Sequence, residues 1–270
     1  MLRVSTAFDT APFGDLLRYW RGVRRTSQLD LSIAAGTTPR YVSFVETGRA
    51  QPSREMVGRL ARALDVPLRE RNGLLLAAGY APQYRVRSLD DVSLARVDAA
   101  LTAMLDHHEP FPAVVLDRGW NVVRANRGAR HLFGALLDPA PVPEPANVLR
   151  LFVAPGPVRD AVANWSDVAA ALLDRARREA TGGVLDATTA ALVDHLTGLP
   201  GVAAAVAAAG AELSTTPVID VRIRLPAVTW SFFSIVSTIG TPTDVTAQEL
   251  RVEAFFPADD TTARGWSVPA

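Results

Sequence analysis

Five residues at fixed spacing in the stretch QLDLSIAAGTTPRYVSFV, residues 28–45, restrict the fold of this chain more than any other feature. Counted from residue 28, positions 4, 5, 9, 15 and 18 are Leu31, Ser32, Gly36, Val42 and Val45. Two helices that cross at a steep angle need a small residue where their backbones approach and a turn residue that tolerates positive φ. They also need apolar residues that hold the second helix. The spacing therefore predicts a helix, a tight turn and a second helix.

Five consecutive short helices are predicted between residues 15 and 80. The first shows the helical period of apolar residues at Leu16, Leu17, Trp20 and Val23. Ser27 and Ser53 precede later helical segments, as N-cap residues do. Tight connections indicate a compact all-α domain over residues 1–80, which a polar, proline-bearing linker over residues 81–91 follows.

Residues 92–270 show a different pattern. Helices are predicted over residues 92–108, 126–133, 147–153, 158–180 and 185–210. Two apolar runs, 113–116 and 120–123, are broken by Asp117-Arg118-Gly119 and indicate a β-hairpin. The stretches VIDVRIRL, WSFFSIVSTIG and LRVEAFFP predict three more strands. This region is therefore predicted to be α+β, with an antiparallel sheet of two strands and then three, separated by a helical insert.

Charge is distributed unevenly between the two regions. Residues 1–87 hold 14 Arg and 7 acidic residues, a net charge of +7. Residues 88–270 hold the other 14 Arg and 21 acidic residues, a net charge of −7. A basic first third and an acidic remainder indicate two domains with different partners.

Catalytic and metal sites are not expected. Cysteine is absent, which excludes thiol catalysis and thiolate metal sites. His107 and His108 are adjacent, so they point to different sides of their predicted helix. No nucleophile elbow or paired-carboxylate motif surrounds the Ser, His and Asp residues. We therefore expect no enzyme activity, no metal and no cofactor.

Membrane insertion is not expected either. The opening MLRVSTAFDTAP lacks the apolar core of a signal peptide. The apolar run GVAAAVAAAGA is shorter than the ~18 residues of a membrane helix. We expect a soluble, cytoplasmic protein.

The stretch SQLDLSIAAGTTPRYVSFVETGRAQPS resembles the XRE (Cro/C1-type) helix-turn-helix regulators, a resemblance that covers about the first 80 residues. It implies that Thr38 caps the recognition helix and that Pro39 is its first residue. It also implies that Arg40, Ser43 and Phe44 face base edges in the major groove of double-stranded DNA.

The chemistry of these residues fits that role unevenly. Arg40 can contact guanine or hold a phosphate, whereas Phe44 can touch only a thymine methyl group or a sugar. Pro39 departs from the polar residue common at its position. Gln28 and Arg49 are predicted phosphate contacts. In the alternative interpretation, Phe44 packs against a neighbouring helix and Arg40 is solvated; the full spacing and the charge of the region favour DNA binding.

Further stretches between residues 70 and 260 resemble the MmyB-like branch of these regulators. They are ERNGLLLAAGYAP, HEPFPAVVLDRGWNVVRANRGA, NVLRLFV, VANWSDVAAALL, WSFFSIVSTIGTP and ELRVEAFFPAD. The resemblance implies that residues 92–270 form a PAS-like domain that binds a small apolar ligand, with fatty acids the best-supported class.

A pocket between the sheet and its helices would hold such a ligand. The candidate lining residues are Trp120, Val122, Trp165, Phe233 with its neighbour Phe232, and Ile235, with Asn126 and Arg159 as polar candidates. A carboxylate would need an anchor such as Arg150 or Arg159, since an unpaired buried charge is costly.

The sequence thus predicts a homodimeric regulator with two partners, a double-stranded operator and a small apolar ligand. The alternative is a DNA-binding regulator whose C-terminal domain is a ligand-free module for dimerisation or partner docking.

Overall fold

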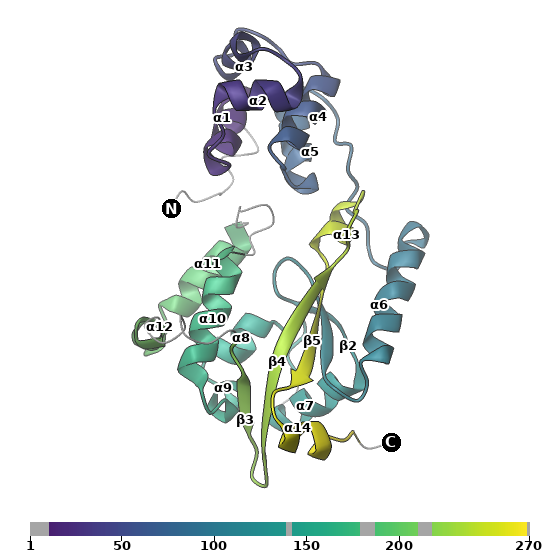
Figure 1. Ribbon diagram of the computed structural model, residues 1–270, viewed down its shortest axis with the longest axis vertical. Coiled ribbons are helices and arrows are strands. Elements are labelled where there is room, and N and C mark those ends of the chain that lie inside the picture. The colour runs from purple at the N-terminus through teal and green to yellow at the C-terminus, as the bar shows by residue number, and fades with distance from the viewer. Residues whose placement is uncertain (1–10, 139–141, 179–186, 210–217, 269–270) are drawn as a thin grey trace. The chain divides into compact units, whose positions relative to one another are not determined.

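Residues 11–138, 142–178, 187–209 and 218–268 are described by the computed structural model (Figure 1). They divide into two compact units. The first contains residues 11–88, Ala187 and Thr241–Gln248. The second contains residues 89–138, 142–178, 188–209, 218–240 and 249–268.

The N-terminal part of the first unit is the predicted bundle of helices. They are α1 (Phe13–Val23), α2 (Gln28–Ala35), α3 (Pro39–Glu46), α4 (Arg54–Ala63) and α5 (Leu68–Ala77). Ser27, Thr38 and Ser53 cap α2, α3 and α4, because each hydroxyl accepts the backbone N–H three residues further on. Each cap satisfies a donor that has no partner inside its helix.

The core of this bundle explains the spacing of its apolar residues. Trp20, Leu31, Val42 and Leu60, from four different helices, are each at most 1% exposed. The helices are short, so their stability depends on this shared core rather than on helix propensity alone. The predicted all-α domain is confirmed.

A short segment from far along the chain completes the first unit. α13 (Val245–Glu249) follows one strand of the second unit and precedes another. Thr246 Oγ1 donates to the carbonyl of Arg87 at 2.6 Å and accepts its N–H at 3.1 Å. The guanidinium of Arg87 pairs with Asp244 at 2.6 Å. Residues 85–88 and 241–248 are therefore joined by both backbone and side-chain bonds.

The same segment caps a helix of the bundle. Pro67 stands at the N-cap of α5 and provides no side-chain acceptor. Gln248 Oε1 instead accepts the N–H of Leu68, the first residue of α5, at 2.7 Å. One of the unpaired donors at a helix start is thus satisfied by a residue 180 positions away.

The second unit is built on an antiparallel sheet with the strand order β2-β1-β5-β4-β3. The strands are β1 (Ala113–Leu116), β2 (Val122–Ala125), β3 (Val221–Arg224), β4 (Thr229–Thr238) and β5 (Arg251–Pro257). β1 and β2 form the predicted hairpin, and β5 pairs with β1 on one side and β4 on the other. The chain order of two strands, a helical insert and three strands is confirmed.

Helices cover both faces of this sheet. On one, here called the α6 face, Ala113, Val115 and Val252 pack against Leu101 and Leu105 of α6 (Ala95–His107), which follows the 3₁₀ turn η2 (Val92–Leu94). The opposite insert face carries Val114, Leu116, Phe232 and Phe255. Figure 1 shows α6 and α10 (Trp165–Arg178) on opposite sides of the sheet. Because β1 is covered on both faces, all four of its residues are buried.

The helical insert contains α7 (Arg127–Leu137), α8 (Val148–Val153), α9 (Pro157–Ala161), α10 (Trp165–Arg178), α11 (Ala187–Thr197) and α12 (Val202–Ala209); α14 (Asp260–Gly265) follows β5. The helical stretch predicted over residues 158–180 contains two helices, α9 and α10, with a break between them. Val162 pairs with Ile223, and Ala163 N–H donates to the carbonyl of Arg222 at 2.7 Å. Bonding to β3 therefore interrupts the helix between α9 and α10.

The helical stretch predicted over residues 185–210 is likewise divided into two helices. α11 ends at Thr197 and α12 begins at Val202. Pro200 lies between them. Gly201 has a φ of 80°, a left-handed conformation that glycine adopts readily and that an α-helix cannot contain. Residues 179–180, 185–186 and 210 of the two predicted helices lie outside the described residues.

Candidate functional site

The second helix of the predicted pair, α3, presents an outward ridge. Val42 and Val45 are buried, Arg40 is exposed, and Ser43 and Phe44 are partly exposed. The guanidinium carbon of Arg40 lies 5.1 Å from the centre of the Phe44 ring. A cation over an aromatic face is attracted by the negative charge of the π system. The two side chains therefore form one cationic surface on the outside of α3.

The turn before α3 has the geometry that its sequence predicts. Gly36 has φ 62° and ψ 47°, in the left-handed region that glycine adopts without a steric penalty. Arg59 of α4 donates to the carbonyl of Gly36 and so fixes the turn from outside. Ser32 is 1% exposed, which confirms a small residue where α2 meets its neighbours.

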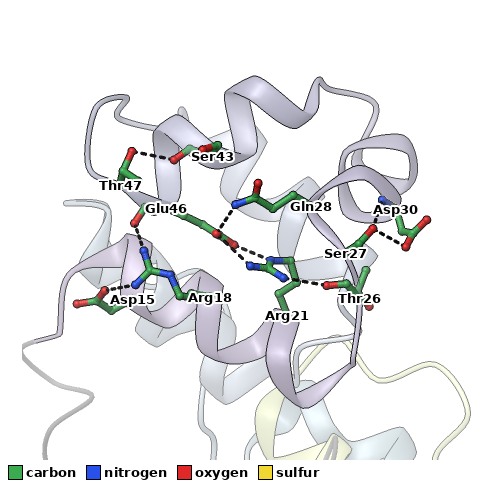
Figure 2. A network of polar contacts seen from close by, with 10 residues as sticks. All are labelled: Asp15, Arg18, Arg21, Thr26, Ser27, Gln28, Asp30, Ser43, Glu46 and Thr47. Atoms are coloured by element: carbon green, nitrogen blue, oxygen red, sulfur yellow. Dashed lines mark hydrogen bonds and ion pairs between the residues drawn. The ribbon is translucent and has the colours of Figure 1, made fainter.

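A buried carboxylate at the end of α3 connects the ridge to the bundle (Figure 2). Glu46 Oε1 accepts from Arg21 Nε at 2.7 Å, and Oε2 accepts from Arg21 Nη2 at 3.2 Å. Gln28 Nε2 donates to Oε2 at 2.7 Å, and Arg18 donates to the backbone carbonyl of Glu46 at 2.8 Å. Glu46, the last residue of α3, is thus bonded to Arg18 and Arg21 of α1 and to Gln28 at the start of α2.

Burial alone would raise the pKa of Glu46. Hydrogen bonds from Arg21 and Gln28, together with the charges of Arg21 and Arg18, outweigh that effect and hold the pKa below its usual value. The hydrogen bond to Glu46 also raises the pKa of Arg21. Both groups are therefore charged at neutral pH, and the pair is a charge-assisted one.

Close backbone approach between α1 and α3 depends on Gly14. A methyl group added to Gly14 would lie 2.5 Å from the carbonyl oxygen of Glu46 and 2.8 Å from that of Val45. Both contacts are with backbone atoms, which cannot rotate away. A glycine in α1 therefore sets the distance at which α3 packs.

In the second unit, charged side chains are buried around Trp120. Arg175 of α10 binds Glu253 of β5 through two bonds of 2.8 and 3.1 Å. The guanidinium carbons of Arg175 and Arg251 lie 4.8 and 4.4 Å from the Trp120 ring centre. Trp120 itself is 1% exposed and has a φ of 67°, which is uncommon for a bulky residue. A strained backbone position therefore holds an indole against two cations.

Several hollows lie on the surface of the second unit. One of about 600 Å³, between α6, β2 and α7, is lined by the cations Arg124, Arg127 and Arg130 and the acids Asp106 and Glu109. One of about 310 Å³ lies among α8, α9 and several prolines. A third, of about 270 Å³, lies between α6 and the ends of β4 and β5, and most of its lining side chains are apolar.

Comparison with known families agrees with this two-part architecture. Residues 12–74 match a helix-turn-helix domain, and residues 97–265 match the MmyB-like transcription regulator ligand binding domain. The second match alone spans more than half of the 270 residues. The chain belongs to the MmyB-like transcription regulators. No curated protein sequence matches it at a significant level.

Most of the predicted DNA-contacting residues of this MmyB-like regulator lie together. Thr38, Pro39 and Arg40 are exposed at the start of α3, and Arg49 is exposed just beyond its end. Gln28 lies at the start of α2, where its amide already donates to Glu46. The phosphate contact predicted for Gln28 stays a prediction, and the structure gives this residue an additional role in holding α3.

The predicted ligand-contacting residues of the MmyB-like regulator do not form one group. Phe233 and Ile235 lie on the α6 face, where Phe233 stacks on Phe256 and Ile235 is 50% exposed. Trp120 and Val122 pack into the core of the insert face. The sheet therefore separates the two sets.

The polar candidates are occupied by structural bonds. Asn126 is 4% exposed; its Oδ1 accepts from the N–H groups of Ala113 and Ala129, and its Nδ2 donates to two carbonyls. The guanidinium of Arg159 lies 3.7 Å from the Trp165 ring centre, and Trp165 Nε1 donates to Phe152. Arg150 borders the hollow beside α8 and α9.

Sequence reasoning missed Glu46, Arg21 and the cluster of Arg175 with Glu253. Glu46 carried a usable signal, because Val42, Val45 and Glu46 follow the i, i+3, i+4 spacing of one helix face. An acid on a buried face requires cationic partners. The Arg175 and Glu253 positions are 78 residues apart, and nothing local indicates that they meet.

Among the described residues of the MmyB-like regulator, no three His, Asp or Glu side chains are placed to hold a metal ion. Within the same ranges no single helix is long and apolar enough to cross a membrane; α11 and α12 meet that criterion together, but the chain bends by 92° between them.

Proposed function

We propose that this MmyB-like regulator binds operator DNA in a sequence-specific manner through α3 and that a small apolar ligand in its second unit changes that affinity. We further propose that it acts as a homodimer in the cytoplasm and catalyses no reaction. The observation that carries the DNA-binding proposal is the outward ridge of Arg40 and Phe44 on a helix fixed from behind by Glu46.

The geometry of α3 supports major-groove binding. A groove about 12 Å wide admits one α-helix, and side chains near the start of the helix reach the base edges. Arg40 lies at the second position of α3, with its guanidinium supported by Phe44. Preorganised arginine loses less conformational freedom when it forms a bidentate contact with guanine.

Homodimer formation follows from the energetics of operator recognition. A single eight-residue helix reads only a few base pairs. Two copies that contact half-sites one helical turn apart, about 34 Å, double the number of readable positions. The proposed homodimer is thus a requirement of specificity rather than an observed interface.

The ligand proposal rests on the family of the second unit. A ligand that prefers one arrangement of a regulator shifts the population toward it, and a coupling of ~1–3 kcal/mol changes DNA affinity by about 5–150-fold. We propose a fatty acid or a similar apolar molecule. The competing proposal is a ligand-free second unit that serves dimerisation or partner docking.

The DNA-binding proposal is tested by selecting duplexes from a random pool with the full-length protein. Affinity for the selected duplex and for a scrambled one is then measured at two salt concentrations, because phosphate contacts dominate non-specific binding. Arg40→Ala is expected to weaken binding to the selected duplex by about 5–150-fold and to the scrambled duplex much less. Arg222→Ala, which removes an exposed cation from β3, is the control. Equal losses of affinity for both duplexes would mean that Arg40 contacts only phosphate.

The ligand proposal is tested by native mass spectrometry of the purified full chain and of its solvent extract. A bound acyl molecule that alters affinity for the selected duplex is the expected result. A protein that carries no small molecule, and whose DNA affinity responds to none of a fatty-acid series, supports the ligand-free alternative.

A further inference from the structure

A groove on the α6 face has the lining of a small-molecule site. Its volume is about 270 Å³, just below the ~300–1,000 Å³ of pockets for drug-sized ligands. Val97, Ala100 and Met104 line it from α6, and Ile239, Leu250 and Val252 line it from the sheet side. We call this hollow the α6 groove. It lies on the side of the sheet opposite Trp120 and the helical insert.

The α6 groove has a cation at its edge and no acidic residue in its lining. Arg96 of α6 is among the lining residues; Arg251 also borders the groove, but its guanidinium lies against Trp120 on the insert face. Arg96 is exposed in the first turn of α6, where water reaches it. An apolar groove with a cation at its edge favours the binding of a molecule that has a carbon chain and an anionic end.

Residues that line the α6 groove precede and follow, in the chain, the segment Thr241–Gln248 of the first unit. Ser237, Thr238 and Ile239 line it just before Thr241, and Leu250 lines it two residues after Gln248. The stretch Thr241–Gln248 is bonded to Arg87 and to the first residue of α5. An occupant of the groove would therefore contact residues of the second unit that are connected through the chain to a segment of the DNA-reading bundle.

We propose that the α6 groove is a binding site for a medium-chain amphipathic carboxylate and that Thr241–Gln248 transmits its occupancy to the helices that read DNA. This inference rests on the proposed ligand-responsive function and assigns it a location and a route. The carbon chain lies along Ala100 and Met104, and the carboxylate is oriented toward Arg96.

The binding site is tested with the full-length protein and carboxylates of six to fourteen carbons, titrated by calorimetry. Affinity is expected to rise about fourfold for each added CH₂ until the groove is full, and then to level off. Decanol, which has the chain but no charge, is expected to bind more weakly than decanoate. Arg96→Gln should lower the affinity for decanoate without changing the affinity for decanol. Arg222→Gln should change neither affinity.

A matched pair of substitutions on one helix locates the site. Ala100 lines the groove, and the neighbouring Ala99 does not; both are exposed, so a larger side chain at either position leaves the core intact. Ala100→Phe fills the groove and is expected to lower decanoate affinity at least tenfold. Ala99→Phe is expected to bind decanoate as the wild type does. Far-UV circular dichroism and the thermal midpoint confirm that both variants are folded.

The outcomes separate this inference from the function on which it rests. If decanoate binds the wild type and both Phe variants equally, the site lies elsewhere; the α6 groove proposal fails, and the ligand-responsive function stands. If no carboxylate of the series binds the wild type, the groove proposal fails together with the proposed ligand class. DNA binding to the selected duplex is scored independently in each case.

The route is tested with Thr246→Val, which keeps the shape of the side chain and removes its hydrogen bonds with Arg87. Thr243→Val, at an exposed position of the same segment, is the control. Decanoate is expected to change wild-type affinity for the selected duplex at least fivefold. The change should be lost in Thr246→Val and kept in Thr243→Val, with decanoate affinity unaltered in both. A response that survives Thr246→Val would overturn the proposed route.

Discussion

Arg21 and Glu46 are joined by two hydrogen bonds, of 2.7 and 3.2 Å, that link α1 to the last residue of the helix carrying Arg40 and Phe44. Glu46 is 2% exposed at its side chain, whereas Arg21 is 21% exposed. α3 has only eight residues, too few to be stable in water alone. The orientation of the outward ridge therefore depends on an ion pair on the opposite side of the helix.

Glu46→Gln should loosen α3 while it keeps the shape of the side chain. The substitution removes the charge that Arg21 binds, and we expect a loss of about 1.5–3 kcal/mol in the free energy of unfolding of the bundle. Chemical denaturation measures the loss, and hydrogen exchange of residues 39–46 localises it. Asp15→Asn breaks an exposed pair with Arg18 and should cost less than about 0.5 kcal/mol. Equal effects of the two substitutions would contradict a special role for Glu46.

The lowered pKa of Glu46 predicts a dependence of stability on pH. The folded-state pKa lies below the usual value of 4.5, so the unfolded chain binds the proton more tightly. The contribution of Glu46 is therefore complete above the usual pKa and is lost as the pH falls through the folded-state value. Thermal unfolding of wild type and Glu46→Gln should differ most near neutral pH and converge as the pH falls below the folded-state pKa of Glu46. A difference that stayed constant over this range would show that the charge is unimportant.

Arg40 and Phe44 should act together on DNA. Their contact predicts a coupling of about 0.5–1 kcal/mol in a double-mutant cycle of Arg40→Ala and Phe44→Ala. Fluorescence anisotropy with the selected duplex at a fixed salt concentration supplies the four affinities. The double variant should lose less affinity than the sum of the single losses. Strict additivity would mean that the two side chains separate when DNA is bound.

Alanine substitutions at Gly14 and Gly22, both in α1, should have opposite effects on the stability of the bundle. Gly14→Ala places a methyl group against the backbone of Glu46 and should destabilise the bundle by about 1–3 kcal/mol. Gly22→Ala meets no atom within 4 Å and should be neutral or stabilise the helix by up to about 1 kcal/mol. Thermal unfolding of both variants distinguishes them. If Gly14→Ala also stabilises, α1 and α3 do not pack as closely as described.

Arg175 should be essential to the second unit, whereas the nearby Arg178 should not. Arg175→Ala leaves Glu253, 5% exposed at its side chain, without its two bonds and should cost about 3–5 kcal/mol. Arg178→Ala removes an exposed pair with Asp174 and should change stability by less than about 0.5 kcal/mol. Denaturation followed by tryptophan fluorescence also reports on Trp120, which contacts Arg175. A small effect of Arg175→Ala would mean that water replaces the guanidinium.

The sequence was sufficient where structure depends on local spacing. Leu31, Ser32 and Gly36 fix the crossing of α2 and α3 through their own size and backbone preference, so their pattern predicted this pair of helices. The hairpin of β1 and β2 was likewise indicated by two apolar runs around Asp117-Arg118-Gly119. The first strand matched residue for residue, whereas the second begins at Val122 rather than Trp120.

The sequence was insufficient where distant residues decide the structure. The helical stretch predicted over residues 158–180 is interrupted because Val162 and Ala163 bond to β3, about 60 residues later. Phe233 and Ile235 share the α6 face, but no local pattern shows which face the helical insert covers. Asn126 was predicted as a ligand contact because it is polar; its four bonds to the surrounding backbone could not be read from its neighbours.

The bond between Gln248 and the start of α5 means that the DNA-reading bundle is not encoded by one continuous stretch of the gene. A fragment cut at residues 81–91 would lack part of its own fold, since Asp244, Thr246 and Gln248 would be left with the other fragment. Exchange of whole modules between related regulators would succeed only if this distant octapeptide travelled with the helices it joins.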